Sequence, residues 1–245
     1  FYARNKLLHL VHPFPSFLKE TVAIAENDQN IAFVQTPQLY SNIHTSPIAK
    51  GAAMQQSIFF ESICEAKSMS NSMFCCGTNV LLRKKHLSHI GGFDENSIME
   101  DFDVSVKLHM QGYSSIYYNH VRAFGMAPEN LSGYLTQQSR WAAGTTKTLV
   151  NLAKYFVTNR SSMTMGQWWE YFLSGSYYFI GWSFFFLMMC PIIFLLFKVP
   201  DWLSHPIIFV SILIPYYLCV AALFFTAMKK RSYKFTQMYK GMILS

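Results

Sequence analysis

Two long stretches without a charged residue lie near the C-terminal end of this chain, and they constrain its fold more than any other feature. The first runs from Phe172 to Phe197 and the second from Pro206 to Met228. A helix needs about 20 apolar residues to cross the hydrocarbon core of a bilayer, and both runs are long enough. Pro191 and Pro215 lie inside these runs, where a transmembrane helix tolerates a kink because neighbouring helices satisfy the freed backbone groups. We therefore predict two transmembrane helices, at about 172–197 and 206–228.

The positive charges around these runs predict an orientation. Five basic residues follow the second run, whereas the loop between the runs contains one lysine; the five are Lys229, Lys230, Arg231, Lys234 and Lys240. Positive residues are retained on the cytosolic side of a membrane. We therefore expect residues 229–245 and residues 1–165 in the cytosol, with the loop outside. Trp168, Trp169 and Tyr171 precede the first run, which is the usual place of an interfacial aromatic belt. The prediction is an integral protein of the plasma or inner membrane with a cytosolic domain, 1–165, and a membrane domain, 166–245.

The composition indicates that this chain interacts with a membrane and not with a nucleic acid. Hydrophobic residues make up 51% of the chain and charged residues only 13%, compared with roughly 25% charged in a soluble domain. The net charge of +7 suits a protein that faces anionic lipid or nucleotide phosphates. The basic residues do not form a stripe interleaved with aromatic residues, so nucleic acid is not an expected partner. The five cysteines show no zinc-binding spacing, and we expect reduced thiols.

Strand and helix signals alternate before the membrane runs. Apolar β-like segments occur at 31–35, 74–82 and 116–118, and helical periodicity occurs at 15–26, 52–69, 83–91, 101–111 and about 130–156. Such alternation predicts an α/β domain with a mostly parallel sheet. The second half of the last helix carries Lys147 and Lys154 among apolar residues, a pattern typical of a helix at a membrane interface.

Gln137, Arg140 and Trp141 are the first candidate functional residues. Their spacing of i, i+3 and i+4 places all three on one face of a helix. Arginine binds phosphate through two parallel hydrogen bonds, glutamine offers a donor and an acceptor, and tryptophan offers a flat apolar face to a sugar ring. This face suits a polar, anionic ligand such as a sugar diphosphate. A tryptophan at such a position can also be a core residue.

Glu100 and Asp101, with Asp103, are the second group. Carboxylates of this kind act as general bases in transfer reactions. The alternative is structural, because acidic residues at the start of a helix are favoured by the helix dipole.

Four motifs in order resemble the processive, membrane-embedded family-2 glycosyltransferases, the group of cellulose, hyaluronan and chitin synthases. They are Cys76-Gly77-Thr78-Asn79, Gly91-Gly92-Phe93, Met99-Glu100-Asp101 and Gln137-x-x-Arg140-Trp141. The resemblance extends from about Ile31 to the C-terminus, and Gln-x-x-Arg-Trp is its most specific motif. Met99 stands where many members carry threonine. This difference does not affect the assignment of the carboxylates, but the motif then does not indicate which sugar is polymerised.

The resemblance implies a fold and a role for three of these motifs. The fold is GT-A, the Rossmann-like fold of nucleotide-diphospho-sugar transferases, present here in part and followed by interfacial and transmembrane helices. Asp101 matches the base and Glu100 a residue that shapes the acceptor pocket. Arg140 and Gln137 match the diphosphate ligands, and Trp141 stacks on the terminal sugar. The turn formed by Cys76, Gly77 and Thr78 lies against the acceptor.

The implied partners are a UDP-sugar donor, a polysaccharide acceptor and the lipid bilayer; partner subunits are not predicted. The implied cofactor is a divalent metal, Mg²⁺ or Mn²⁺. In the family its Asp-x-Asp ligands and the uridine-binding aspartate lie N-terminal to the region matched here. We therefore assign no metal ligand in this chain, and we expect the chain, which begins at Phe1, to be part of a longer protein.

The predicted activity is inverting transfer of a sugar to a growing β-linked polysaccharide, coupled to its export. Two alternatives remain open at this point. A non-processive membrane transferase that makes a glycolipid can share the Gln-x-x-Arg-Trp motif, and a catalytically inactive membrane subunit would need neither Asp101 nor Trp141.

Overall fold

Strand β2 (Ile31–Gln35) is the centre of the main sheet, as its apolar sequence predicts. All five of its residues are buried. In the computed structural model, which describes residues 12–94, 97–158, 161–197 and 206–229, β2 pairs in parallel with β5 (Ser114–Tyr117) and antiparallel with β4 (Val80–Leu82). The prediction of a mostly parallel sheet is therefore wrong, and the α/β domain contains a mixed sheet.

The predicted strand over 74–82 is wrong in extent, because only Val80–Leu82 is a strand. Gly77 has a φ of +75° and Asn79 a φ of +54°. Residues in this left-handed region interrupt a strand. The segment before β4 is instead a turn, which becomes important at the candidate site.

A second small sheet has the strand order β1-β6-β3 and was not predicted. Its strands are β1 (His12–Pro13), β3 (Leu39–Tyr40) and β6 (Ala123–Gly125). β6 pairs antiparallel with β1 and in parallel with β3. Strands of two or three residues are too short to show alternation in a sequence.

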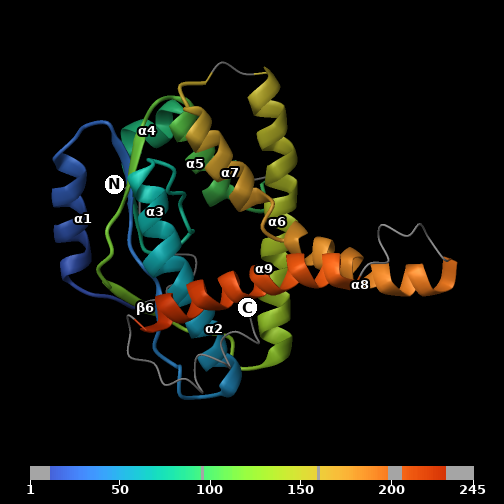
Figure 1. Cartoon of the computed structure of the whole chain (residues 1–245). Coiled ribbons are helices and arrows are strands. Elements are labelled where there is room, and N and C mark those ends of the chain that lie inside the picture. The colour runs from blue at the N-terminus through green and yellow to red at the C-terminus, as the bar shows by residue number, and fades with distance from the viewer. Residues whose placement is uncertain (1–11, 95–96, 159–160, 198–205, 230–245) are drawn as a thin grey trace.

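Helices surround these sheets (Figure 1). Their bounds are α1 (Ser16–Glu26), α2 (Pro47–Ile58), the π-helical turn η1 (Phe59–Ile63), α3 (Cys64–Met69), α4 (Lys84–His89), α5 (Glu100–Met110), α6 (Leu131–Thr158), α7 (Met165–Gly175), α8 (Phe179–Phe197) and α9 (Pro206–Lys229). The helix predicted at 52–69 begins five positions earlier, at Pro47, where the Ser46 hydroxyl accepts a hydrogen bond from Ala49 N at 3.0 Å. Serine before proline is a helix-start signal.

α5 is packed on two sides, and this packing fixes the direction of its first turn. Val104 and Leu108 contact the sheet side of the core, where Phe33 is buried. Phe102 and Val106 belong to a second cluster, which includes residues of α6 and α7. Burying each such side chain contributes about 1.5–3 kcal/mol, so α5 is firmly held. α5 ends before Gly112, whose φ of +82° confirms the predicted stop.

α7 is attached to the α/β domain by polar contacts of three side chains on one of its faces. Gln167 Nε2 donates to Asn71 O at 2.7 Å, Glu170 Oε2 lies 2.7 Å from Lys67 Nζ, and the Tyr171 hydroxyl lies 2.6 Å from His109 Nδ1. Burial lowers the pKa of His109 to about 4, so its ring is neutral at pH 7. Trp168 and Tyr171 are only 5% and 1% exposed.

The predicted aromatic belt is therefore wrong for Trp168 and Tyr171, because both side chains are buried on the protein side of α7. Trp169, at 64% exposed, is the member that faces outward.

The first predicted transmembrane helix is not continuous. α7 ends at Gly175 and α8 begins at Phe179, and the two helices are bent by 61° at this break. Among the described residues, no single helix combines the length and hydropathy that a bilayer span requires, although Met165–Gly175 and Phe179–Ile193 together do. The second predicted helix, 206–228, corresponds to α9, which ends one residue later, at Lys229.

α8 and α9 contact each other through aromatic rings. Phe184 of α8 lies 5.7 Å from the Tyr216 ring and 6.1 Å from the Tyr217 ring of α9. The predicted loop at 198–205 and the basic segment at 230–245 lie outside the described residues.

Candidate active site

The Asp101 carboxylate lies directly against the Gly77 turn. A methyl group placed on Gly77 would be 2.7 Å from Asp101 Oδ2, closer than a methyl carbon and an oxygen atom approach in a van der Waals contact. The structure thus brings together two predicted site residues, from segments separated by more than 20 positions in the sequence. Cys76 and Thr78 belong to the same turn, and Glu100 is the first residue of α5.

The environment of Asp101 raises the pKa of its carboxyl to about 6. Burial is the largest cause; the Glu100 carboxylate adds to the shift, while the Phe102 N–H and the Arg140 guanidinium act against it. The Phe102 N–H donates to Asp101 Oδ1 at 2.9 Å. A carboxyl with a pKa near 6 is ionised at pH 7 and is a stronger base than an ordinary aspartate. This property suits a group that accepts a proton from a hydroxyl.

Asp103 does not belong to the site, although Asp101-Phe102-Asp103 has the form of a metal-binding pair. Its side chain is 2% exposed and lies 2.6 Å from Lys107 Nζ. In the part of the chain that the structure describes, no group of three or more His, Cys, Asp or Glu side chains could hold a metal ion. Among the described residues we therefore assign no ligand to the divalent metal that the resemblance implies.

α6 places the Gln-x-x-Arg-Trp motif beside the start of α5. Gly144, one turn after the motif, faces Met99 so closely that a methyl group there would be 2.8 Å from Met99 Sδ. Arg140 is exposed, and its charge lowers the pKa of Asp101. Trp141 is half-buried, and its contact with a sugar remains a prediction.

Gln137 is directed towards Tyr40. Burial raises the pKa of the Tyr40 hydroxyl to about 12, and hydrogen bonds with Gln137 and Gln56 partly oppose this shift. Gln138, the neighbour of Gln137, accepts a hydrogen bond from the Tyr178 hydroxyl at 2.8 Å. The motif helix is thus connected to β3, to α2 and to the break between α7 and α8.

The Cys76 thiol is directed into the protein. It lies beside Cys64, and this contact, together with burial, raises the pKa of the Cys76 thiol well above its usual value. Its sulfur lies 3.7 Å from Phe74 O. All five cysteines are free thiols, as predicted. A thiol with a raised pKa is a poor nucleophile, so a role of Cys76 at the site would come from its backbone.

Two residues that were not predicted as site residues hold this turn. Gln35, at the end of β2, has no solvent exposure, and its amide contacts the turn on both sides of Gly77. Ser105, on α5, accepts a hydrogen bond from Cys75 N at 2.7 Å. A glutamine that ends a buried apolar strand is the one sequence signal that points to such a role.

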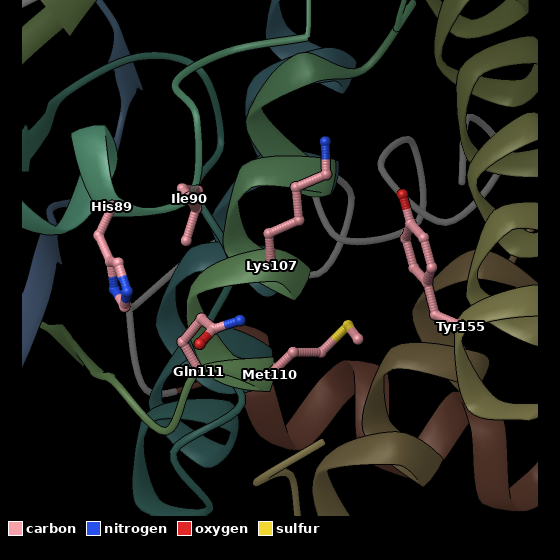
Figure 2. Close-up of a pocket in the computed structure, with 6 residues that line it drawn as sticks. All are labelled: His89, Ile90, Lys107, Met110, Gln111 and Tyr155. Atoms are coloured by element: carbon pink, nitrogen blue, oxygen red, sulfur yellow. The ribbon is translucent and has the colours of Figure 1, made fainter. Parts of the chain in front are cut away.

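A separate pocket of about 280 Å³ lies at the other end of α5 (Figure 2). Its lining residues are His89, Ile90, Lys107, Met110, Gln111 and Tyr155. Along α5 its lining begins at Lys107, six positions after Asp101, which corresponds to about 9 Å along the helix. This lining contains no carboxylate, and Lys107 lies against Asp103, so the pocket is not the candidate active site.

In this site a carboxylate of raised pKa lies beside the helix that carries the Gln-x-x-Arg-Trp motif. Comparison with known proteins identifies the family: residues 12–228 match the family described as "Glycosyl transferase family group 2". The chain belongs to this family.

Relatives within the family include synthases of polysaccharides. Over 206 residues the chain is 32% identical to a UDP-forming cellulose synthase catalytic subunit of Dictyostelium discoideum, and the match covers 82% of this chain and 19% of that protein. It is 24% identical over 215 residues to the UDP-forming cellulose synthase catalytic subunit of Pseudomonas fluorescens (strain SBW25), covering 83% and 28%. It is 30% identical over 133 residues to "Probable glucomannan 4-beta-mannosyltransferase 7" of Oryza sativa subsp. japonica, covering 54% and 23%. The matches thus span between 19% and 28% of the length of these relatives.

Proposed function

We propose that this chain is part of a processive, inverting glycosyltransferase that transfers a sugar from a UDP-sugar to the end of a growing β-linked polysaccharide. The observation that carries the proposal is the Asp101 carboxylate, held against Gly77 with a pKa raised to about 6. Membership of glycosyl transferase family group 2 and the similarity to cellulose synthases support it.

The reaction assigns one task to each part of the site. Asp101 accepts the proton of the acceptor hydroxyl as the hydroxyl oxygen forms a bond to the anomeric carbon. The bond from that carbon to the donor diphosphate breaks, and its electrons leave on the diphosphate. Arg140 and Gln137 stabilise this leaving group by charge and by hydrogen bonds, and Glu100 shapes the acceptor pocket. Attack from the face opposite the leaving group inverts the anomeric configuration.

The test is a panel of radiolabelled nucleotide sugars, with glucose and mannose among them, on membranes that contain the full-length protein. We expect one donor to give a product of high molecular weight, and digestion with linkage-specific hydrolases to identify its linkage. A product that stays a short glycolipid would support the non-processive alternative. Absence of turnover with every donor would support an inactive subunit.

Trp141→Ala is expected to reduce polymer formation while donor binding is kept, because Trp141 stacks on the acceptor and not on the nucleotide. Removing such a stacked aromatic residue costs about 1–3 kcal/mol, or roughly 5- to 150-fold in rate. The measurements are initial rates of polymer synthesis and titration of UDP binding. Trp169→Ala changes an exposed tryptophan of α7 and is the matched control, with a rate near that of the unmodified enzyme. Equal loss of donor binding and polymer synthesis in Trp141→Ala would assign this residue to the nucleotide instead.

We also propose that α8 and α9 are embedded in the membrane. Large apolar side chains are exposed along both helices, among them Phe186, Met188, Leu196, Ile207 and Leu218. Exposed apolar surface of this extent is unfavourable in water. The break between α7 and α8 then lies at the membrane surface.

Cysteine labelling tests the proposed orientation. A cysteine at position 202 is expected to react with an impermeant reagent in intact cells, whereas a cysteine at 234 should react only after permeabilisation. The positive charge after α9 is the physical reason. The five native cysteines would also react with the reagent. The two new cysteines are therefore introduced into a chain in which the native ones are replaced. The reverse labelling pattern would place Asp101 outside the cell and contradict the proposed orientation.

A further inference from the structure

Gln35 holds one side of the turn at 75–78, which lies against Asp101, through hydrogen bonds. Its side chain is completely buried. Its Oε1 accepts a hydrogen bond from Cys76 N at 3.0 Å, and its Nε2 donates to Thr78 O at 2.8 Å. One amide group therefore binds the residue before Gly77 and the residue after it. Nε2 also donates to Thr36 O at 2.8 Å, which fixes the amide to its own strand.

Ser105 holds the other side of the same turn, also through hydrogen bonds. Its hydroxyl accepts from Cys75 N at 2.7 Å and donates to Asp101 O at 2.8 Å, and the residue has no solvent exposure. The same oxygen thus joins the backbone of the turn to the backbone of the aspartate that the turn covers. Between these two attachments, Gly77 lies on the Asp101 carboxylate.

We propose that Gln35 and Ser105 are positioning residues that hold the turn at 75–78 closed over Asp101 and thereby exclude water from the base. The inference rests on the proposed function, in which Asp101 accepts the proton of the acceptor hydroxyl. It extends that function, because it makes the basicity of Asp101 depend on two side chains that touch neither sugar nor nucleotide.

The charges around Asp101 fit this role. Glu100 on α5 raises the pKa of Asp101 and Arg140 on α6 lowers it, while burial is the largest cause of the raised value. The titratable groups that face it from the turn are the thiols of Cys75 and Cys76, and burial contributes to a raised pKa for both, so they are neutral at pH 7. Because burial outweighs each of these charges, opening the turn to water is the change that would most lower the pKa of Asp101.

The test is the pH dependence of kcat/KM for polymer synthesis by the full-length enzyme. The unmodified enzyme is expected to lose activity as the pH falls through about 6, where Asp101 becomes protonated. Gln35→Ala removes both contacts to the turn. We expect the acid limb of the pH profile, where activity is lost as the pH falls, to move to lower pH by about one pH unit. The maximal rate should also be lower, because a weaker base is less effective.

Gln167→Ala is the matched control. Gln167 is also a buried glutamine whose Nε2 donates to a backbone carbonyl, Asn71 O, and whose Oε1 accepts from a backbone N–H, that of Thr164. Its loss destabilises the protein in a similar way but does not touch the turn at 75–78. The acid limb of Gln167→Ala should stay near pH 6.

Ser105→Ala opens the turn from the other side, so the test remains possible if Gln35→Ala does not fold. The same downward shift in Ser105→Ala is expected. Acid limbs that stay near pH 6 in the folded Gln35 and Ser105 variants, or that move equally in Gln167→Ala, would overturn the inference. Asp101→Asn separates the two proposals: if it keeps turnover, the proposed function fails, whereas if it is inactive and the limbs do not move, only the positioning role fails.

Discussion

Asp101→Asn is expected to slow sugar transfer by at least about a hundredfold, the usual effect of removing a general base. Asparagine keeps the shape of the side chain and cannot accept the proton, so UDP binding should be largely kept. The measurements are the initial rate of transfer and a binding titration with UDP. Glu100→Gln, which changes the neighbouring carboxylate, should have a milder effect. Near-normal turnover in Asp101→Asn would show that another group is the base.

The same variant should be at least as stable as the unmodified protein at neutral pH. The pKa of Asp101 in the folded protein, about 6, lies above its ordinary value of 3.8. The ionised carboxylate therefore opposes folding above pH 6, by about 3 kcal/mol at most, and this cost disappears as the pH falls towards 4. We expect the melting temperature of Asp101→Asn to equal or exceed that of the unmodified protein at pH 7.5. Below pH 4 this advantage should vanish.

Gly77→Ala is expected to reduce activity strongly, although less than the loss of the base. An alanine at a φ of +75° is strained by about 1–2 kcal/mol, and its methyl group would also meet Asp101 Oδ2 at 2.7 Å. The carboxylate or the turn must then move, which displaces the base from the acceptor. We expect at least a tenfold loss of kcat/KM, since small misplacements of a reacting group cost up to about a hundredfold.

Gly91→Ala separates these two causes. Gly91 has a φ of +86°, and nothing lies within 4 Å of a methyl group placed on it. The control therefore carries the backbone strain alone and should lose stability, as measured by thermal melting, while it keeps the transfer rate. If the two alanine variants behave alike, the carboxylate is not held against the turn.

Sequence reasoning predicted the local features of the fold well. The burial of β2, the positions of α1 and α5 and the stop at Gly112 all follow from short patterns that depend on neighbouring residues. It also predicted Asp101 and Gly77 as site residues, and the structure shows that they lie against each other, which is a tertiary feature. The π-helical turn at 59–63 inside the helix predicted over 52–69 has no sequence signal that we recognised.

The features that sequence reasoning missed depend on long-range contacts. Gln35 and the turn that it holds are more than 40 positions apart, and no periodicity reports such a contact. Trp168 and Tyr171 resemble an interfacial belt in sequence, but α7 directs them into the core beside Phe102. The bend after Gly175 separates two helices within a continuous apolar run. A hydropathy profile shows the length of such a run but not whether the helix bends within it.

The contacts of α7 and of the break that follows it have a mechanical consequence. α7 is fixed to the α/β domain through Gln167, Glu170 and Tyr171, whereas α8 starts beyond the break, where Tyr178 bonds to Gln138 of α6. A force on α8 therefore acts first on the joint at 176–178. From this joint, the hydrogen bond between Tyr178 and Gln138 connects directly to α6, next to Gln137. α7 stays in place because it is bound to the α/β domain, and it supports α5. Displacement of α8 is thus transmitted to α6, which carries Gln137, Arg140 and Trp141, before it reaches the carboxylate of Asp101.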